Sequence, residues 1–132
     1  MADELMTIRQ MCDLYDVTPR TLRFYEAKEL LAPIRRGQKR LFTRRDRGRL
    51  TLILRGKRFG FSLEEIRELL DLYDLGDGRF TQLTRAMKLG RERLDGLRQQ
   101  RADLDAAIAE LEDQLSSGDA MLAEMQPDKR AG

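Results

Sequence analysis

The pattern of apolar and polar residues predicts a short helix close to the start of the chain. Residues 1–6 carry no periodic pattern and are expected to form a frayed lead-in. Thr7 can cap a helix that ends near Tyr15. Its inward-facing residues follow the spacing i, i+3, i+4 and i+7, and they are Ile8, Met11, Cys12 and Tyr15. This pattern makes Cys12 a small buried apolar residue, with a redox or metal-binding role as the alternative.

A second short helix follows the turn at Asp16 and Val17 and has its own start signal. Thr18 can accept hydrogen bonds from the amides of the first turn, and Pro19 at the first helical position loses no hydrogen bond there. The helix is expected to reach about Lys28. Two short helices joined this closely are typical of a helix-turn-helix, whose second helix reads the major groove of DNA.

Basic residues on the second helix favour a recognition role. Leu22 and Tyr25 share the side that packs inward, while Arg20 and Arg23 lie on the remaining surface. Core packing does not explain two arginines on so short a helix. We therefore interpret residues 18–28 as a recognition helix for DNA.

A β-hairpin is predicted between residues 30 and 42, where the helical pattern stops. Pro33 excludes a continuing helix, and Gly37 separates two short runs of apolar and basic residues, as in a hairpin. We expect a two-stranded wing with its tip at residues 36–39. An isolated hairpin is marginally stable in water, so the wing must lean on the helices beside it.

A third helix is predicted from the cap at Thr43 to about Phe59. Its inward residues are Leu50, Ile53 and Leu54. Its exposed positions are expected to include Arg44, Arg45, Arg47, Arg49, Arg55, Lys57 and Arg58. Residues 35–58 carry eleven basic side chains and one acidic one, whereas solvated helix faces normally mix both signs. This excess favours a phosphate-contacting surface over an ordinary solvated face.

A fourth helix is predicted after Gly60, because Ser62 and Glu65 have the spacing of a capping box. Its apolar stripe consists of Leu63, Ile66, Leu69, Leu70 and Tyr73. Residues 74–78 contain two glycines in three positions, which makes a poor helix interior and marks the expected domain boundary.

A sustained heptad pattern predicts one long helix from about residue 80 to residue 115. Alternating steps of four and three connect Leu83, Met87, Gly90, Leu94, Leu97, Arg101, Leu104, Ile108, Leu111 and Leu115, which we call the dimer seam. No second helix of that length is predicted, so the partner should be another copy of the chain. Arg101 is the odd member, and it either extends its charge to solvent or fixes the register. Residues 116–118 are expected to break the helix, and Asp119 to cap a short final turn.

Charges beside the seam indicate an antiparallel pair of helices. With Leu94 at position a, successive e positions hold Arg91, Arg98, Asp105 and Glu112. In a parallel dimer like charges would meet, whereas in an antiparallel dimer each arginine faces an acid. Exposed pairs contribute only about 0–1 kcal/mol each, but replacing repulsion by attraction at four places selects an orientation.

Composition sets the limits of the functional interpretation. The net charge of +2 divides into +8 for residues 1–60 (fifteen basic, seven acidic) and −6 for residues 61–132 (ten basic, sixteen acidic), so the N-terminal half suits a polyanion. There is one cysteine and no histidine, so a conventional zinc site lacks ligands. No cofactor, metal or enzymatic activity is expected. The sequence shows no signal peptide or membrane-spanning run, and a cytoplasmic location is expected.

The expected fold is mainly α, in three parts. Residues 1–75 should form a winged helix-turn-helix DNA-binding domain, and residues 76–118 a linker with a coiled-coil dimerisation helix. Residues 119–132 should form a short C-terminal helix and tail. Besides a transcription regulator, the sequence is compatible with an architectural or excisionase-like winged-helix protein that bends DNA, or with an oligomerisation adaptor. The long dimerisation helix argues against the DNA-bending alternative.

The segment from Thr7 to Leu70 closely resembles the MerR family of bacterial transcription regulators. The resemblance rests on Thr-Pro-Arg-Thr-Leu-Arg-Phe-Tyr-Glu at 18–26, on residues 37–42, and on Gly-Phe-Ser-Leu-Glu-Glu-Ile at 60–66. The long dimerisation helix matches in position. The resemblance implies an antiparallel homodimer that binds an inverted repeat in double-stranded promoter DNA. It also implies that activation distorts this DNA for RNA polymerase.

The resemblance also implies roles for single residues. Arg20 aligns with a base-contacting position, and Arg23, Tyr25, Arg40 and Phe42 align with backbone-contacting positions. Phe42 departs from the tyrosine that the family often has there. With the basic surface, the candidate DNA-binding residues are Thr18, Arg20, Thr21, Arg23, Tyr25, Arg36, Lys39, Arg40, Phe42, Arg44, Lys57 and Arg58.

Within the family, residues 55–61 and 69–74 resemble the LiuR-like subgroup, which controls branched-chain amino acid and fatty acid catabolism. Metal-sensing members carry cysteines near the end of the dimerisation helix, and multidrug-sensing members carry a large ligand domain. This chain has neither feature after residue 118. The identity of any small-molecule effector is left open.

Overall fold

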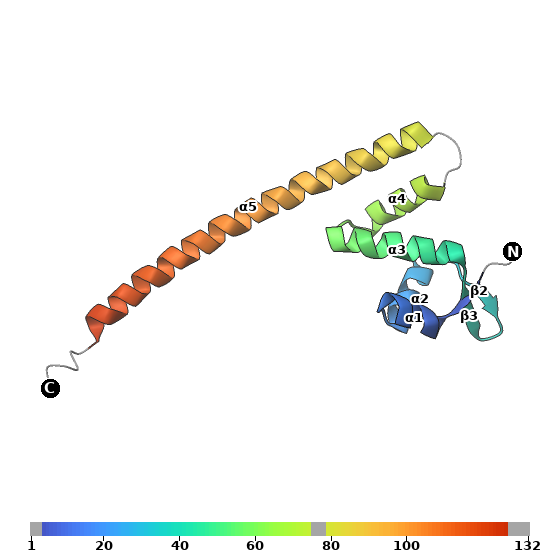
Figure 1. Ribbon diagram of the computed structural model, residues 1–132, viewed down its shortest axis with the longest axis horizontal. Coiled ribbons are helices and arrows are strands. Elements are labelled where there is room, and N and C mark those ends of the chain that lie inside the picture. The colour runs from blue at the N-terminus through green and yellow to red at the C-terminus, as the bar shows by residue number, and fades with distance from the viewer. Residues whose placement is uncertain (1–3, 75–78, 127–132) are drawn as a thin grey trace. The chain divides into compact units, whose positions relative to one another are not determined.

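The computed structural model describes residues 4–74 and 79–126, and its elements are mainly helical (Figure 1). In chain order they are β1 (Met6–Thr7), α1 (Ile8–Tyr15), α2 (Pro19–Ala27), β2 (Ile34–Arg36), β3 (Lys39–Phe42), α3 (Arg44–Phe59), α4 (Leu63–Asp74) and α5 (Arg79–Met125). The chain divides into two compact units, residues 1–88 and residues 89–132. The prediction of a helix-turn-helix with a small wing and a long C-terminal helix is confirmed.

Short-range capping bonds start the N-terminal helices where the sequence predicts them. The hydroxyl of Thr7 accepts from the Gln10 amide at 3.2 Å, and the Gln10 side chain accepts from the Thr7 amide at 2.8 Å. At α2, the Thr18 hydroxyl accepts from the Thr21 amide at 3.1 Å, and Pro19 occupies the first turn. Each bond satisfies an amide that has no partner inside its helix.

The capping box of α4 and the end of α3 are also as predicted. The Ser62 hydroxyl accepts from the Glu65 amide at 3.1 Å, and the Glu65 carboxylate accepts from the Ser62 amide at 2.8 Å. Gly60 ends α3 with a φ of 87°, a left-handed conformation that glycine adopts without a steric penalty. The side chain of Tyr73 and residues 75–78 lie outside the described residues.

The wing has three strands, which corrects the prediction of a two-stranded hairpin after an unstructured lead-in. The antiparallel sheet has the order β1-β3-β2, with Met6 opposite Phe42 and Arg36 opposite Lys39. Gly37 adopts a φ of 61° at the first position of the two-residue turn. β1 gives β3 a backbone partner on its second side, so the wing is joined to the residues that lead into α1.

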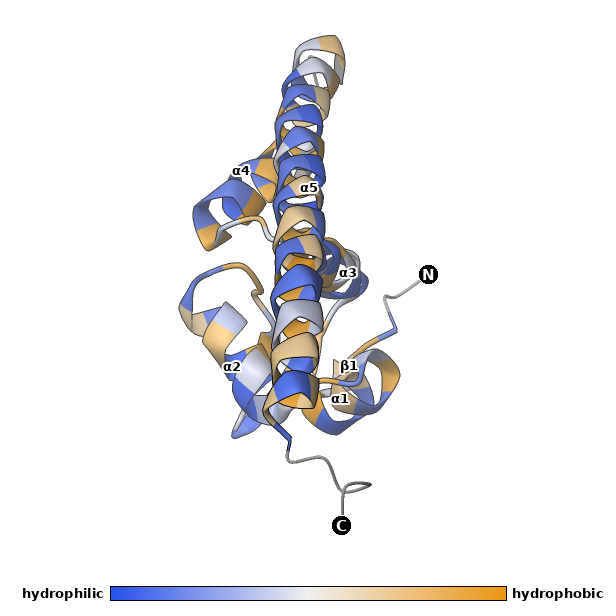
Figure 2. Ribbon diagram, turned by 90° about the vertical axis from the view of Figure 1, so that its left-hand side faces the viewer, coloured by the Kyte–Doolittle hydropathy of each residue, from blue (hydrophilic) through white to orange (hydrophobic). Residues whose placement is uncertain are grey.

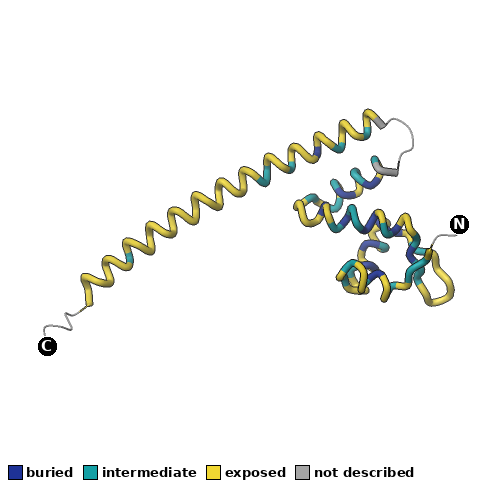
Figure 3. Tube along the Cα trace, in the orientation of Figure 1, coloured by how far each residue is buried: buried dark blue, intermediate teal, exposed yellow. Residues whose placement is uncertain are grey.

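One apolar core joins α1, α2, the wing, α3 and α4. Phe42 of β3 is fully buried and lies in the same cluster as Met11, Leu22 and Ile66. The cluster is completed by Tyr25, Leu30, Leu31, Leu50, Ile53 and Leu70. Figure 3 shows these buried segments concentrated in the N-terminal elements. The core therefore fixes the recognition helix and the wing against the same interior.

The buried face of α3 contains two charged residues, which the prediction for this helix missed. Its buried residues are Asp46, Arg49, Leu50, Ile53 and Gly56. Arg49 was expected on the exposed face, but it is only 8% exposed, and its Nε donates to the Leu30 carbonyl at 2.7 Å. The correction has a clear cause, because a buried acceptor makes it possible to bury the guanidinium.

A glycine allows α3 and α4 to approach closely. A Cβ atom added at Gly56 would lie 2.9 Å from Cγ1 of Ile66, which is closer than real side chains come. Ile66 is buried at this contact. Any larger residue at position 56 must therefore separate the two helices or displace Ile66.

α5 continues to Met125, so the predicted break at residues 116–118 is wrong. A glycine inside a helix costs only about 1 kcal/mol relative to alanine, and the good helix formers on both sides of Gly118 outweigh that cost. Most large apolar side chains of this helix are exposed, as Figure 3 shows. In the described part of the chain, no helix is both long enough and apolar enough to cross a membrane.

Candidate nucleic-acid interface

The recognition helix α2 presents two arginines on its exposed surface. Arg20 and Arg23 are both exposed, and Arg20 has no hydrogen bond or ion pair within the described residues. The Thr18 hydroxyl already caps the helix by accepting from the Thr21 amide, and the hydroxyl oxygens of the two residues lie 2.9 Å apart. The side chain of Arg20 can therefore reach a ligand without breaking an internal contact.

Tyr25 and Phe42 are buried residues, which changes their expected roles. Phe42 is fully buried, and its ring supports the wing from the core, while its place among the DNA-binding residues stays a prediction. Tyr25 is 4% exposed, and burial raises the pKa of its hydroxyl. Phe24 lies edge-on to Tyr25 at 5.6 Å between ring centroids. Aromatic packing thus fixes the C-terminal end of α2.

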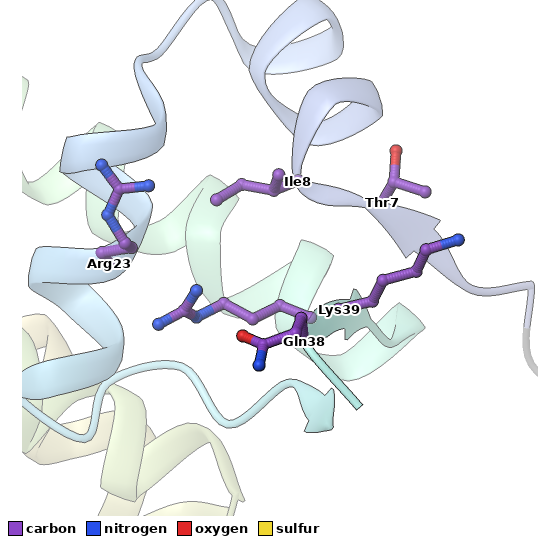
Figure 4. A pocket seen from close by; sticks show the side chains of 6 residues that line it. Thr7, Ile8, Arg23, Gln38 and Lys39 are labelled. Atoms are coloured by element: carbon purple, nitrogen blue, oxygen red, sulfur yellow. The ribbon is translucent and has the colours of Figure 1, made fainter. Parts of the chain in front are cut away.

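An opening of about 250 Å³ lies where the recognition helix, the wing and the start of α1 meet (Figure 4). Its lining residues are Thr7, Ile8, Arg23, Gln38, Lys39 and Arg40. In Figure 4, Arg23 projects from α2 on one side, and Gln38 and Lys39 lie on the wing on the other. Three cations and no acid line this opening, so it suits an anionic group such as a phosphate.

Glu26 connects the last turn of α2 to both strands of the hairpin, β2 and β3. Its carboxylate accepts from Arg40 Nε of β3 at 2.5 Å and from Arg35 of β2 at 3.0 Å. Burial alone raises the pKa of Glu26, but the hydrogen bonds from Arg40 and Arg35 outweigh this effect and lower it. Arg40 therefore shares one carboxylate with Arg35, so its positive charge is partly balanced inside the protein. Part of its function is to hold the wing against α2.

Replacing Glu26 with glutamine is expected to loosen the wing. The amide can accept from one arginine but turns its NH₂ toward the other, so about 1–3 kcal/mol of stability should be lost at pH 7. Because the pKa of Glu26 is lowered in the folded state, this contribution is complete above its ordinary value of 4.5 and is lost as the pH falls through the folded value. Urea unfolding at pH 7 and at lower pH measures the difference.

Glu29 provides the matched control for this prediction. It is an exposed acid close to Glu26, and the described residues give it no side-chain partner. Glu29→Gln should leave unfolding unchanged at both pH values. Equal effects of Glu26→Gln and Glu29→Gln would show that the two arginine contacts do not stabilise the wing.

The remaining predicted cations of the wing and α3 have different environments. Arg36, Lys39, Arg44, Arg55, Lys57 and Arg58 are exposed. Arg47 is partly buried, and its guanidinium donates to the Glu4 carbonyl at 2.7 Å. Lys57 and Arg58 lie in the last turn of α3, where positive charge also complements the helix dipole. Apart from Arg40, Arg47 and Arg49, the basic side chains are thus placed at the surface, as predicted.

Cys12 is partly buried and packs against the core. Burial and the nearby Asp13 raise the pKa of its thiol, and Arg23 acts in the opposite direction. A raised pKa disfavours the reactive thiolate. The environment therefore fits the small apolar role that the helical pattern predicts.

The candidate dimer-interface residues all lie on α5. Leu97 is partly buried and the other predicted seam residues are exposed, as are the flanking Arg91, Arg98, Asp105 and Glu112. Figure 2 shows apolar residues recurring along a helix that is otherwise hydrophilic. In the described part of a single chain, the apolar side chains of this stripe other than Leu97 are thus exposed to solvent.

Two family models cover the chain from the wing to the long helix. The model of the MerR HTH family regulatory protein matches residues 6–72, and the model described as MerR, DNA binding matches residues 47–114. Each match spans more than half of the chain. The chain belongs to the MerR family. It is therefore a DNA-binding transcription regulator of the MerR type, and the family places it outside the enzymes.

Curated MerR relatives match the N-terminal half of the chain. The HTH-type transcriptional regulator ZntR of Escherichia coli (strain K12) is 40% identical over 67 residues, which are 49% of this chain and 48% of ZntR. CueR of Vibrio cholerae (strain ATCC 39315) is 38% identical over 69 residues, which are 51% of this chain and 50% of CueR. The chain thus spans about half the length of the curated relatives it matches.

Solved MerR structures share the fold over most of the chain. The regulator HiNmlR, described as lacking the sensor domain and bound to promoter DNA, is 25% identical with a TM-score of 0.65, covering 86% of this chain and 85% of HiNmlR. The N-terminal part of the Bacillus subtilis multidrug transporter activator, MtaN, is 28% identical with a TM-score of 0.62, covering 83% of this chain and 97% of MtaN. The MerR-type architecture therefore includes α5.

Proposed function

We propose that this MerR protein binds an inverted-repeat promoter operator as a homodimer, with α2 of each protomer in a major groove. The observation that carries the proposal is the cationic opening between α2 and the wing. Arg20, at the start of the same helix, has no side-chain partner among the residues that the structure describes. The promoter-DNA complex of HiNmlR supports this choice of ligand. Here α2 reads bases while the opening and the wing tip hold phosphates.

Arg20→Ala is expected to lower the discrimination between operator and random DNA by about 1–3 kcal/mol, the value of a bidentate base contact. Random DNA offers no specific base contact, so its affinity should change little. Fluorescence anisotropy with both duplexes at one fixed salt concentration measures the ratio. An unchanged specificity ratio would contradict the base-reading role of Arg20.

Arg36 and Lys39 at the wing tip provide the matched comparison. Their side chains are exposed and have no ion-pair partner among the described residues, so they are free to contact phosphates. Arg36→Ala or Lys39→Ala should weaken operator and random DNA about equally. Loss of one phosphate contact should also reduce the slope of log K against log salt by about one.

The proposed dimer is an antiparallel coiled coil of two α5 helices. Opposing the e positions pairs Arg91 with Glu112 and Arg98 with Asp105, and it places Leu97 opposite Ile108 of the partner. In a Cys12→Ser background, Leu97→Cys with Ile108→Cys should give a crosslinked dimer under mild oxidation. Crosslinking of Leu97→Cys to itself, in the single variant, would contradict the antiparallel arrangement.

Control of transcription is proposed to follow from distortion or occlusion of the promoter, with RNA polymerase as the partner at the distorted site. The resemblance of residues 55–61 and 69–74 to the LiuR-like subgroup supports genes of branched-chain amino acid or fatty acid catabolism as targets. Genome-wide footprinting tests both parts. Footprints between promoter elements would support promoter control, and footprints away from promoters would favour the architectural, DNA-bending alternative.

A further inference from the structure

We propose that Phe24 of the recognition helix α2 reads a thymine by contacting its C5-methyl group in the major groove. The proposal rests on the proposed function, because it requires α2 to lie in that groove, and it adds a second base-reading residue beside Arg20. Thymine differs from the other bases in the major groove by its methyl group, which apolar side chains recognise. An exposed phenyl ring on a recognition helix has the chemistry for this contact.

Phe24 is the large apolar side chain that stays exposed within α2, a helix that the structure describes in full. Leu22 and Tyr25 point into the core and are 0% and 4% exposed, whereas Phe24 is 40% exposed. The exposed side chains near it on the helix, Arg20 and Arg23, are charged. An aromatic ring in such a position gains free energy when an apolar group covers it.

The helical period places Phe24 beside Arg20 and away from the wing. Successive residues of an α-helix lie about 100° apart around the axis, so residues four apart are neighbours on one face. Arg23 lines the opening toward the wing, and Arg20 lies between Arg23 and Phe24 around the helix. Phe24 therefore lies on the flank of the base-reading surface that is remote from the opening suited to a phosphate.

Two contacts hold the ring of Phe24 in place. The ring of Tyr25 packs against it edge-on, with an interplanar angle of 86°. The ammonium of Lys28 lies over the ring of Phe24, 5.6 Å from its centroid, a distance typical of a cation–π contact. A ring that is already held loses little side-chain entropy on binding, and the ammonium places positive charge where the phosphate backbone would approach.

The spacing of Arg20 and Phe24 predicts where the thymine lies. Four residues advance by about 6 Å along an α-helix, and successive base pairs of DNA are about 3.4 Å apart. The thymine should therefore lie within about two base pairs of the base that Arg20 contacts. In an inverted repeat, it should occur at the same place in each half-site.

Uracil substitution tests this contact with the unaltered protein, because uracil pairs as thymine does but lacks the methyl group. The probe is an operator duplex that the full chain selects from a random library. Arg20→Ala locates the base pair that Arg20 reads, and each thymine near it is then replaced in turn by uracil. Burial of one methyl-sized group contributes a factor of about four to affinity, so fluorescence anisotropy should show about four-fold weaker binding for one uracil position per half-site.

Two protein variants assign the effect to Phe24. Phe24→Ala should bind the thymine and uracil duplexes equally, because the ring that contacts the methyl group is gone. Phe59→Ala is the matched control, since it removes a phenyl ring of similar exposure, 43%, from the end of α3. This control variant should keep the four-fold preference for thymine.

The possible outcomes separate this proposal from the proposed function. If no uracil near the base pair read by Arg20 weakens binding, or if Phe24→Ala keeps the preference, this proposal fails while operator binding stands. If Phe24 only supports Lys28 against phosphates, Phe24→Ala should weaken operator and random DNA equally and uracil should have no effect, which also overturns the thymine contact. If the selection recovers no operator, the proposed function fails, and this proposal fails with it.

Discussion

Replacing Asp46 with alanine is expected to destabilise the N-terminal unit by about 2–5 kcal/mol. The Asp46 carboxylate is 2% exposed and accepts three hydrogen bonds. One oxygen accepts from the Ala32 amide at 3.0 Å, and the other accepts from the amide and the hydroxyl of Thr43, each at 3.0 Å. Alanine would leave two backbone amides without their acceptor, and each loss costs about 1–3 kcal/mol when the group stays buried.

The measurement is urea unfolding of the full chain, with two comparison variants. Asp46→Asn keeps the size and one acceptor oxygen, so it should lie between wild type and Asp46→Ala. Asp71→Ala removes an exposed acid of α4 that has no side-chain partner among the described residues, and it should change stability by less than about 0.5 kcal/mol. If Asp46→Ala matched Asp71→Ala, the buried hydrogen bonds would not contribute to stability.

Replacing Ile108 with glutamate is expected to dissociate the proposed dimer and weaken operator binding by at least about 100-fold. The change sets two carboxylates, one from each copy, into the apolar seam opposite Leu97 of the partner, where an unpaired charge is costly to bury. Joining two binding modules raises affinity by about 10²–10⁴-fold, and a monomer forfeits this gain. Sedimentation and anisotropy on a duplex with both half-sites measure the two effects.

Ala106→Glu is the matched control for this prediction. Position 106 lies on the outer face of the same helix, two residues away, and receives the same added charge. This variant should remain dimeric and bind the operator with nearly wild-type affinity. A full-affinity, dimeric Ile108→Glu protein would place the dimer contact elsewhere in the chain.

Local signals in the sequence were sufficient to predict most helices. Thr7, Thr18 and Thr43 each bond to an amide three residues ahead, so the cap and its partner are visible within one turn of sequence. Gly37 and Gly60 mark a turn and a helix end through their positive φ values. These features depend on neighbours in the chain, and for that reason the sequence reveals them.

Features that depend on distant residues were missed. The buried positions of α3 follow the helical spacing 46, 49, 50, 53 and 56, but the first two are charged and so were not counted as core. The helical spacing of these five positions was the signal in the sequence that could have identified Asp46 and Arg49 as buried. Their acceptor and donor partners, the Leu30 carbonyl and the Ala32 amide, lie in a segment whose place against α3 is set only by the complete fold.

The same limit applies to the wing and to the recognition residues. β1 contains two residues, which is too short to show an alternating pattern, and its partner Phe42 lies far along the chain. The contacts of Glu26 with Arg35 and Arg40 join three elements and have no sequence signature. Consequently Arg40 and Phe42 were both assigned to the DNA surface, although Arg40 is ion-paired with Glu26 and Phe42 is buried.

The central position of β3 has a mechanical consequence. β3 is hydrogen-bonded on both sides, and Glu26 joins the hairpin to α2. The wing tip and the recognition helix therefore belong to a single rigid structural unit. Moving the wing away from the recognition helix would break the β1–β3 pairing and both ion pairs of Glu26 at once. When a DNA duplex contacts both the wing tip and the recognition helix, the DNA rather than the protein must therefore deform. DNA sequences whose grooves deform easily should bind at a lower energetic cost.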